Sequence, residues 1–302
     1  MSKQIYLKIA DTVVLLESKF EYAKNDKGIA PERFSNFFYK KAIPDIKIEI
    51  QIVEKFPQDF YRPDGFSTIH PQDKSLCWQW EEKKDYFIFR SLVEGKFQLA
   101  QIEKNFKNVR FFVLPQKNKF IWFATDVIYD FLQILFLVYF AKTKKGIFLH
   151  ASGINLYGSG FVFAGKSGVG KTTLAKLWNK YSDAEILNDD RIIVRKQNKQ
   201  FFIYGCPWHG AFSDYLKSRM HPAPLKKVFF IYPAKKNILK KLNFFDAFKL
   251  LYPAIFPVFW DRLSLNNIFL FLNDLLENIV CFSLGFRKTK DIIKFFKEKC
   301  LN

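Results

Sequence analysis

A glycine-rich turn in the middle of the chain constrains its fold more than any other feature of the sequence. Residues 161–178 read FVFAGKSGVGKTTLAKLW, and the stretch from Gly165 to Thr172 satisfies the pattern GxxxxGK[ST]. The apolar run 161–164 predicts a strand before the turn, and the pattern over 172–180 predicts a helix after it. This order is typical of a P-loop, or Walker A motif, in an α/β domain.

Each part of this turn suits the binding of a nucleoside triphosphate with magnesium. The glycines allow the backbone to curl with its N–H groups inward, and the next helix directs its positive end to the same place. Lys171 can reach the β- and γ-phosphates, and the Thr172 hydroxyl can coordinate Mg²⁺. The alternative, a glycine-rich turn without a ligand, explains less of the pattern. The residues predicted to bind ATP are Gly165, Lys166, Ser167, Gly168, Val169, Gly170, Lys171, Thr172 and Thr173.

Two adjacent acids follow the predicted helix. Asp189 lies 18 positions after Lys171, and Asp190 precedes the strand-like run RIIV. Because one short helix and one turn connect Asp189 to Lys171, we expect the acids and the loop to meet at the same end of the sheet. One could bind Mg²⁺, directly or through water, and the other could accept a proton from an attacking hydroxyl. The alternative is a solvated helix-to-strand turn.

A histidine precedes the loop by one strand. His150 lies 15 residues before Gly165, on the strand expected to pair just ahead of the loop. A lone histidine on a buried strand is usually a core residue. Here an acid–base role, or a role in orienting an aspartate, is the functional interpretation.

The segments LHASGINLYGSGFVFAGKSGVGKTTLA and LNDDRIIV resemble the catalytic domain of the HPr serine kinase/phosphorylase family. The resemblance implies a fold closer to phosphoenolpyruvate carboxykinase than to ordinary P-loop kinases. It also implies that Asp189 is the catalytic base and His150 its partner. Thr172 and Asp190 would lie at or near the metal. Looser similarity continues through YGCPWHGAF, PLKKVFFIYPAKKN, FPVFWD and VCFSLGFRKTKDIIKFF, as in HPr-kinase-like proteins found near peptide- and cofactor-modifying enzymes.

The chain departs from the family pattern at three places. Thr173 stands where HPr kinases usually have Glu, and Ala151 stands where they have Gly after the histidine. No Glu-x-Arg-Gly-Leu-Gly segment is found. These departures argue against phosphorylase activity and against HPr as the substrate.

The segment GCPWHG, residues 205–210, is a second candidate for part of the site. Two glycines bracket a rigid loop that carries His209, a side chain capable of acid–base chemistry. In the functional interpretation His209 faces the acceptor or the γ-phosphate. An ordinary turn explains the segment about as well.

The order of predicted elements gives two domains. Residues 1–124 contain many short alternating runs and predict a β-rich α+β domain, for which we expect a role in substrate recognition. Residues 125–302 predict the P-loop domain, with a mixed sheet of HPr kinase/phosphoenolpyruvate carboxykinase type. We expect it to open with a helix capped at Thr125 and stopped at Gly146, and to close with a helix over Asp291–Cys300.

Composition limits the function classes. Of the 302 residues 49% are apolar, which excludes a disordered chain, while the formal net charge is +19. The lysines are scattered and no nucleic-acid-binding signature accompanies them, so nucleic acid is not the favoured partner. The four cysteines form no CxxC or zinc pattern and are expected to be reduced thiols in a cytoplasmic protein. No secretory signal is expected, and the most apolar run, 131–141, is too short to span a membrane.

Together these features favour a kinase that uses ATP and Mg²⁺ to phosphorylate a hydroxyl, most readily Ser or Thr of a peptide or protein. A kinase of a small-molecule hydroxyl, or a nucleotide-binding switch or ATPase module with weak or no transfer, are the alternatives. A nucleic-acid-dependent ATPase would explain the charge but lacks helicase motifs. The resemblance also implies a homo-oligomer.

Overall fold

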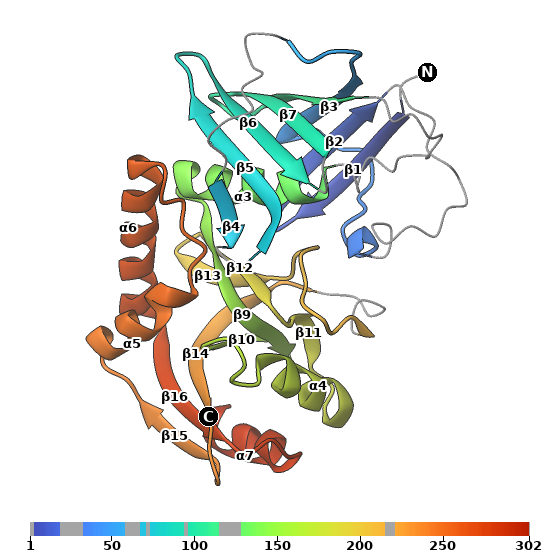
Figure 1. Cartoon of the computed structure of the whole chain (residues 1–302). Coiled ribbons are helices and arrows are strands. Elements are labelled where there is room, and N and C mark those ends of the chain that lie inside the picture. The colour runs from blue at the N-terminus through green and yellow to red at the C-terminus, as the bar shows by residue number, and fades with distance from the viewer. Residues whose placement is uncertain are drawn as a thin grey trace. The chain divides into compact units, whose positions relative to one another are not determined.

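The structure, a computed structural model, divides the chain into two compact units, Met1–Leu132 and Gln133–Asn302 (Figure 1). It describes residues 3–18, 33–57, 67–70, 73–93, 96–114, 128–214 and 221–301. Each unit contains a sheet of eight strands in which parallel and antiparallel pairs are mixed. The predicted α/β class with a mixed sheet is therefore confirmed.

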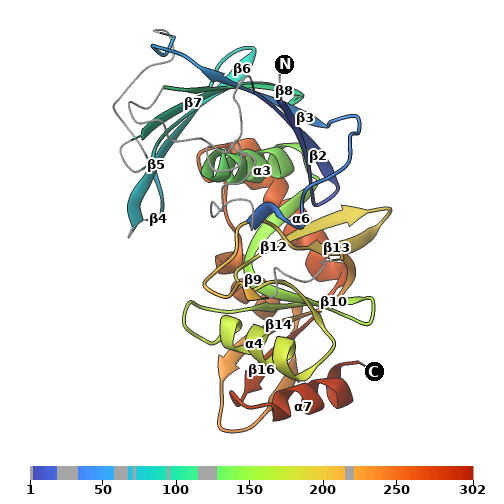
Figure 2. The ribbon, with the colours of Figure 1, turned by 90° about the vertical axis from the view of Figure 1, so that its right-hand side faces the viewer.

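The first unit is built on a single sheet with the strand order β1-β2-β3-β8-β7-β6-β5-β4. Its strands are β1 (Lys3–Ile9), β2 (Thr12–Ser18), β3 (Ile46–Ile52), β4 (Ser67–His70), β5 (Asp73–Glu82), β6 (Tyr86–Val93), β7 (Lys96–Glu103) and β8 (Asn108–Val113). Only the β2–β3 and β3–β8 pairs are parallel among the strand pairs described in this unit. Figure 2 shows the strong curvature of this sheet.

Helix α3 (Tyr129–Thr143) begins in the first unit and continues into the second. In the first unit the ring of Phe131 lies 5.1 Å from that of Phe89 and 4.9 Å from that of Phe111, between ring centroids. Every residue from Phe131 to Ala141 is buried, including Gln133. The apolar run is thus a buried helix, as predicted. No helix in the described part of the chain is long and apolar enough to cross a membrane.

The predicted ends of this helix need correction. Thr125, its expected cap, lies outside the described residues. Gly146 does not stop the helix but opens the next strand, and the left-handed residue after the helix is Lys144, with φ of 56°. Gly146 is required for another reason, because a methyl group there would lie 2.5 Å from the carbonyl oxygen of Val194.

The second unit carries the glycine-rich loop of residues 165–170. Its elements are β9 (Gly146–Leu156), β10 (Ser159–Ala164), α4 (Lys171–Tyr181), β11 (Glu185–Asn188), β12 (Arg191–Gln197), β13 (Gln200–Tyr204), β14 (Ala223–Pro233), β15 (Ile238–Lys241), α5 (Phe244–Leu251), the 3₁₀ turn η3 (Tyr252–Ala254), α6 (Arg262–Asn278), β16 (Val280–Phe286) and α7 (Asp291–Cys300). The helices predicted over 172–180 and 291–300 are confirmed.

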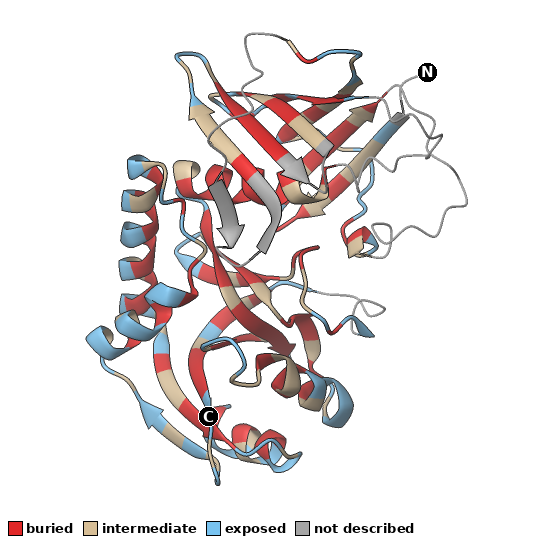
Figure 3. Cartoon of the chain, in the orientation of Figure 1, coloured by how far each residue is buried: buried red, intermediate tan, exposed pale blue. Residues whose placement is uncertain are grey.

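Two long strands, β9 and β14, organise this unit. The first half of β9 pairs with β12, and its second half pairs with β10 and β11. Strand β14 pairs first with β13 and then, in parallel, with β10 and β16. Figure 3 shows both long strands buried over most of their length. Because β10, β14 and β16 are parallel, their carboxyl ends lie at one edge of the sheet, where ligands of open α/β sheets bind.

An aromatic core holds α4 at that edge. Trp178 on α4 meets Phe296 on α7 with 5.1 Å between ring centroids, and Phe296 lies 4.9 Å from Phe229 on β14. Leu174 and Phe163 belong to the same buried cluster. Burial of the α4 face that carries Leu174 and Trp178 fixes this helix near the carboxyl end of β10. The glycine loop of residues 165–170 is therefore held between two packed elements.

Candidate active site

The loop of residues 165–170 needs glycine at three positions for different reasons. Gly168 and Gly170 have φ of 79° and 113°, which side-chain-bearing residues rarely adopt. A methyl group on Gly165 would lie 2.9 Å from the carbonyl oxygen of Ile231. Gly170 is also the N-cap residue of α4. The backbone can therefore curl tightly against β14 and lead directly into the helix.

Lys171 lies across the inside of this loop. Its Nζ donates to the carbonyl oxygens of Gly165, at 2.9 Å, and Lys166, at 3.3 Å, and the side chain is buried. Burial lowers the pKa of Lys171, while the charge of Asp190 acts in the opposite direction. Phosphate oxygens can replace the two carbonyl acceptors, because the ammonium already lies inside the loop.

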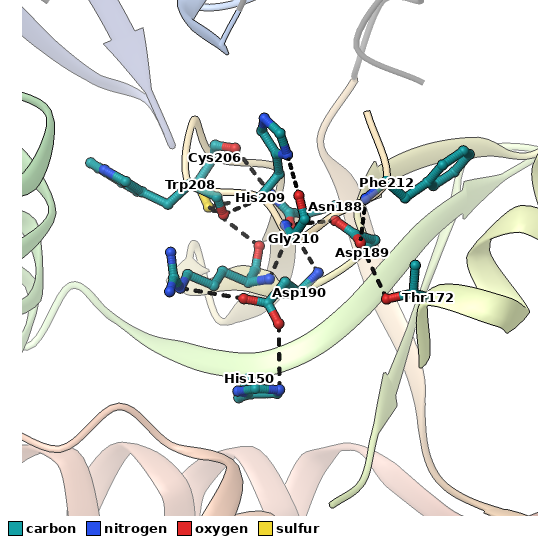
Figure 4. A network of polar contacts seen from close by, with 11 residues as sticks. His150, Thr172, Asn188, Asp189, Asp190, Cys206, Trp208, His209, Gly210 and Phe212 are labelled. Carbon is teal, nitrogen blue, oxygen red and sulfur yellow. Dashed lines mark hydrogen bonds and ion pairs between the residues drawn. The ribbon is translucent and has the colours of Figure 1, made fainter. Parts of the chain in front are cut away.

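The first acid of the pair is buried beside the first turn of α4. The Thr172 hydroxyl donates to Asp189 Oδ2 at 3.3 Å, and the Asp189 side chain is fully shielded from solvent (Figure 4). The backbone N–H of Gly210 donates to its Oδ1 at 2.9 Å, and that of Phe212 to its Oδ2 at 3.3 Å. These donors stabilise a buried carboxylate next to the predicted magnesium ligand.

The second acid points to the opposite side and is accessible. Asp190 Oδ1 lies 3.4 Å from His150 Nε2, and Oδ2 lies 3.5 Å from Arg191 Nε. The Asp190 side chain is 26% exposed. His150 and Arg191 are cross-strand partners on β9 and β12, which brings both to this carboxylate. Figure 4 shows the two aspartates directed toward Thr172 and toward His150.

An aromatic side chain supports this histidine. The ring of Phe256 stacks on that of His150, with 6.1 Å between centroids and 18° between planes. The guanidinium carbon of Arg191 lies 5.5 Å from the centre of the Phe256 ring. The Phe256 N–H donates to the carbonyl oxygen of Phe148 at 3.0 Å, which attaches this segment to β9.

The contacts differ from the predicted partners in one respect. The sequence interpretation joined His150 to Asp189, and Thr172 to Asp190, whereas the structure joins His150 to Asp190 and Thr172 to Asp189. The two acids lie in the bend between β11 and β12, where their side chains point to different partners. The sequence alone could not tell which acid faces which partner.

His209 lies in the same loop as Gly210 but not against the carboxylates. Its Nδ1 lies 2.7 Å from the carbonyl oxygen of Gly210, and Figure 4 shows the ring directed away from Asp190. Among the loop residues, Lys166, Ser167 and Gly168 are exposed. Thr173 lies half-buried in the first turn of α4.

Asn188 is the residue that sequence reasoning missed. It is fully buried, and its Nδ2 donates to the carbonyl oxygens of Cys206 and Trp208 at 3.0 and 3.2 Å. Its Oδ1 accepts from the N–H groups of Asp190 and Arg191 at 2.9 and 2.8 Å. One amide thus joins the turn that carries the acids to the loop of residues 205–210. The available signal was a polar side chain directly after the apolar pair Ile186 and Leu187.

The donor set fits a magnesium ion bound with phosphates. Mg²⁺ in such sites takes one or two protein oxygens and fills its other positions with phosphate and water. Thr172 and Asp189 offer these oxygens next to the loop. No group of three or more His, Cys, Asp or Glu side chains that could hold a metal ion occurs among the described residues.

Neither a protein-family model nor a curated protein sequence matches this chain. Among solved structures, the HPr(Ser) kinase/phosphatase from Coxiella burnetii is similar with a TM-score of 0.29 and 8% identity. The match covers 50% of this chain and 93% of that one. A likeness this weak assigns no residue roles, so the roles below depend on the contacts already described.

Proposed function

We propose that the second unit is a kinase that transfers the γ-phosphate of Mg-ATP to a hydroxyl, most readily Ser or Thr of a peptide or protein. One observation carries this proposal. Beside a P-loop, one carboxylate is buried against the loop threonine and the next is accessible beside a histidine. A site that only held nucleotide would need the first carboxylate but not the second.

The phosphate chain lies in the loop in this proposal. Backbone N–H groups of residues 165–170 and the Lys171 ammonium stabilise the charge of the transferring phosphoryl group. Thr172 and Asp189 would hold Mg²⁺, which neutralises phosphate charge when bound. Asp189 suits this role because its carboxylate is already fixed by Gly210 and Phe212.

Asp190 is the proposed base. As the acceptor oxygen forms its bond to the γ-phosphorus, the bond from that phosphorus to the β–γ bridging oxygen breaks and ADP leaves. The hydroxyl proton passes to Asp190, the acid of the pair whose side chain is partly accessible. His150 and Arg191 both contact this carboxylate and orient it. This assigns to Asp190 the role that sequence reasoning gave to Asp189.

The remaining site residues receive limited roles. His209 takes no part in proton transfer in this proposal, because its Nδ1 contacts the Gly210 carbonyl oxygen and its ring is directed away from Asp190. The N-terminal unit is the proposed place of acceptor recognition. A small-molecule acceptor and a nucleotide-dependent switch are the competing functions, and the test below separates them.

The test is transfer of label from γ-labelled Mg-ATP to Ser/Thr peptide and protein pools, and separately to small hydroxyl compounds. Asp190→Asn should lower transfer by about 10²–10⁴-fold while nucleotide affinity is kept. Asp189→Asn should instead raise the Mg²⁺ concentration needed for half-maximal rate. Asp274→Asn is the matched control, because Asp274 forms a surface ion pair with Lys196 at 2.5 Å.

Three results would change the assignment. Full transfer by Asp190→Asn would remove Asp190 as the base. Label found only in small compounds would replace the peptide or protein acceptor. Tight nucleotide binding without any transfer by the wild type would leave a nucleotide-dependent switch.

A further inference from the structure

A second lysine lies directly over the phosphate loop. A methyl group on Gly170 would lie 3.1 Å from Phe286 Cζ, 3.2 Å from Lys288 Cε and 3.7 Å from Lys288 Nζ. Lys288 belongs to the turn between β16 and α7, more than a hundred residues after the loop in the sequence. Its ammonium is therefore held beside the first residue of α4 by tertiary structure alone.

The turn that carries Lys288 is fixed on two sides. The N–H of Ala234 donates to the carbonyl oxygen of Phe286 at 3.0 Å, and the N–H of Arg287 donates to Asn237 Oδ1 at 2.9 Å. Phe286 is fully buried in the core behind α4. Because β16 runs parallel to β14 and β14 to β10, this turn emerges at the same edge as the loop. The backbone next to Lys288 is thus fixed beside the loop, and the exposed Lys288 side chain extends from it.

The charge of Lys288 is not compensated within the described part of the chain. Lys288 is exposed, and it forms no ion pair or hydrogen bond with a described residue. The nearby carboxylate of Asp291 instead accepts from the Thr289 hydroxyl at 3.1 Å. A cation at the positive N-terminal end of a helix is unfavourable until an anion arrives between them. The place therefore suits an anion that also contacts the loop amides.

We propose that Lys288 binds the phosphate chain of the nucleotide from the side opposite Lys171. This deepens the proposed function and rests on it. Lys171 reaches the chain from inside the loop, while Lys288 reaches it from the β16–α7 turn. Two cations on one chain favour nucleotides with two or three phosphates over monophosphates, because only a longer chain can contact both.

Calorimetric titration of the full chain with Mg-ATP, Mg-ADP, AMP and inorganic tripolyphosphate tests this inference. Lys288→Gln should weaken ATP and tripolyphosphate binding about tenfold or more and leave AMP binding unchanged. Lys288→Arg should restore affinity to within about threefold, since the charge is kept. Lys294→Gln is the control, because Lys294 is 85% exposed on the following helix.

The outcomes separate the two proposals. If Lys288→Gln binds ATP as the wild type does while transfer continues, the role of Lys288 is overturned and the kinase stands. Equal weakening of AMP and ATP would also overturn it, because the second cation would then not recognise the chain. If the wild type binds no nucleotide and transfers no phosphate, both proposals fall.

Discussion

Two loops of the second unit are bracketed by glycines and lie beside the same pair of acids, yet they are built in opposite ways. The loop of residues 165–170 is local, because a strand, the loop and a helix follow one another without interruption. The loop of residues 205–210 is held from a distance, by Asn188 and by the Asp189 carboxylate. The first loop can therefore be recognised from a local sequence motif. The second loop has no motif that shows which distant residues hold it.

Each loop also depends on a buried tryptophan. Trp178 on α4 lies behind the first loop, and Trp208 lies within the second; both are fully buried. The Trp208 ring lies 6.0 Å from that of Phe136 and 5.9 Å from that of Phe148, between centroids. If the second loop supports the acids as firmly as the first supports the phosphates in the proposed function, both tryptophans should matter for transfer.

The largest expected effect is that of Trp208→Ala. Removing a fully buried tryptophan should lower the free energy of unfolding by about 3–5 kcal/mol. Urea unfolding followed by circular dichroism measures it, with Trp208→Phe as the milder control. Transfer by the folded fraction should fall as well, because Gly210 would lose its fixed position against Asp189. If Trp208→Ala unfolds at lower urea concentration but its folded fraction transfers phosphate as the wild type does, the loop of residues 205–210 contributes to stability and not to transfer.

The next effect is that of Asn188→Ala. The substitution leaves two buried carbonyl oxygens without their donor and two N–H groups without their acceptor. We expect a loss of about 2–4 kcal/mol in the free energy of unfolding. Asn278→Ala serves as the control, because Asn278 is exposed and bonds within its own helix. Equal unfolding midpoints for the two variants would contradict the role of Asn188 as a link between turn and loop.

The two loops show which features could be predicted from the sequence and which could not. The phosphate loop, its flanking strand and helix, and the buried helix around Phe131 could be predicted because each is specified by residues close in sequence. The contacts of Asp189 and Asp190 could not, since they depend on which way adjacent side chains point at the end of β11. The position of Lys288 depends on the parallel order of β10, β14 and β16, which no local pattern encodes.

The substitutions Gly210→Ala and Gly168→Ala are a matched pair that tests whether the two loops have separate tasks. A methyl group on Gly210 would lie 2.7 Å from Asp189 Oδ2, whereas one on Gly168 would meet nothing within 4 Å. Gly210→Ala should cost about 1–3 kcal/mol of stability and lower kcat more than tenfold, because it displaces the carboxylate. Gly168→Ala should cost about 1–2 kcal/mol through left-handed strain and act mainly on the KM for ATP. The same KM-to-kcat pattern in both variants would mean that the two loops do not have separate tasks.

The smallest effect concerns Cys206, a thiol that only the second loop contains. Burial raises its pKa to about 12, so the folded state keeps the thiol protonated where the unfolded state ionises. The stability from this group is complete below the unfolded pKa, near 8.5, and is lost as pH rises toward 12. Across that window the wild type should lose up to about 1.4 kcal/mol per pH unit more than Cys206→Ala does. Urea unfolding at pH 8, 9 and 10 measures the difference in slope, and parallel slopes would mean that water already reaches this thiol in the folded loop.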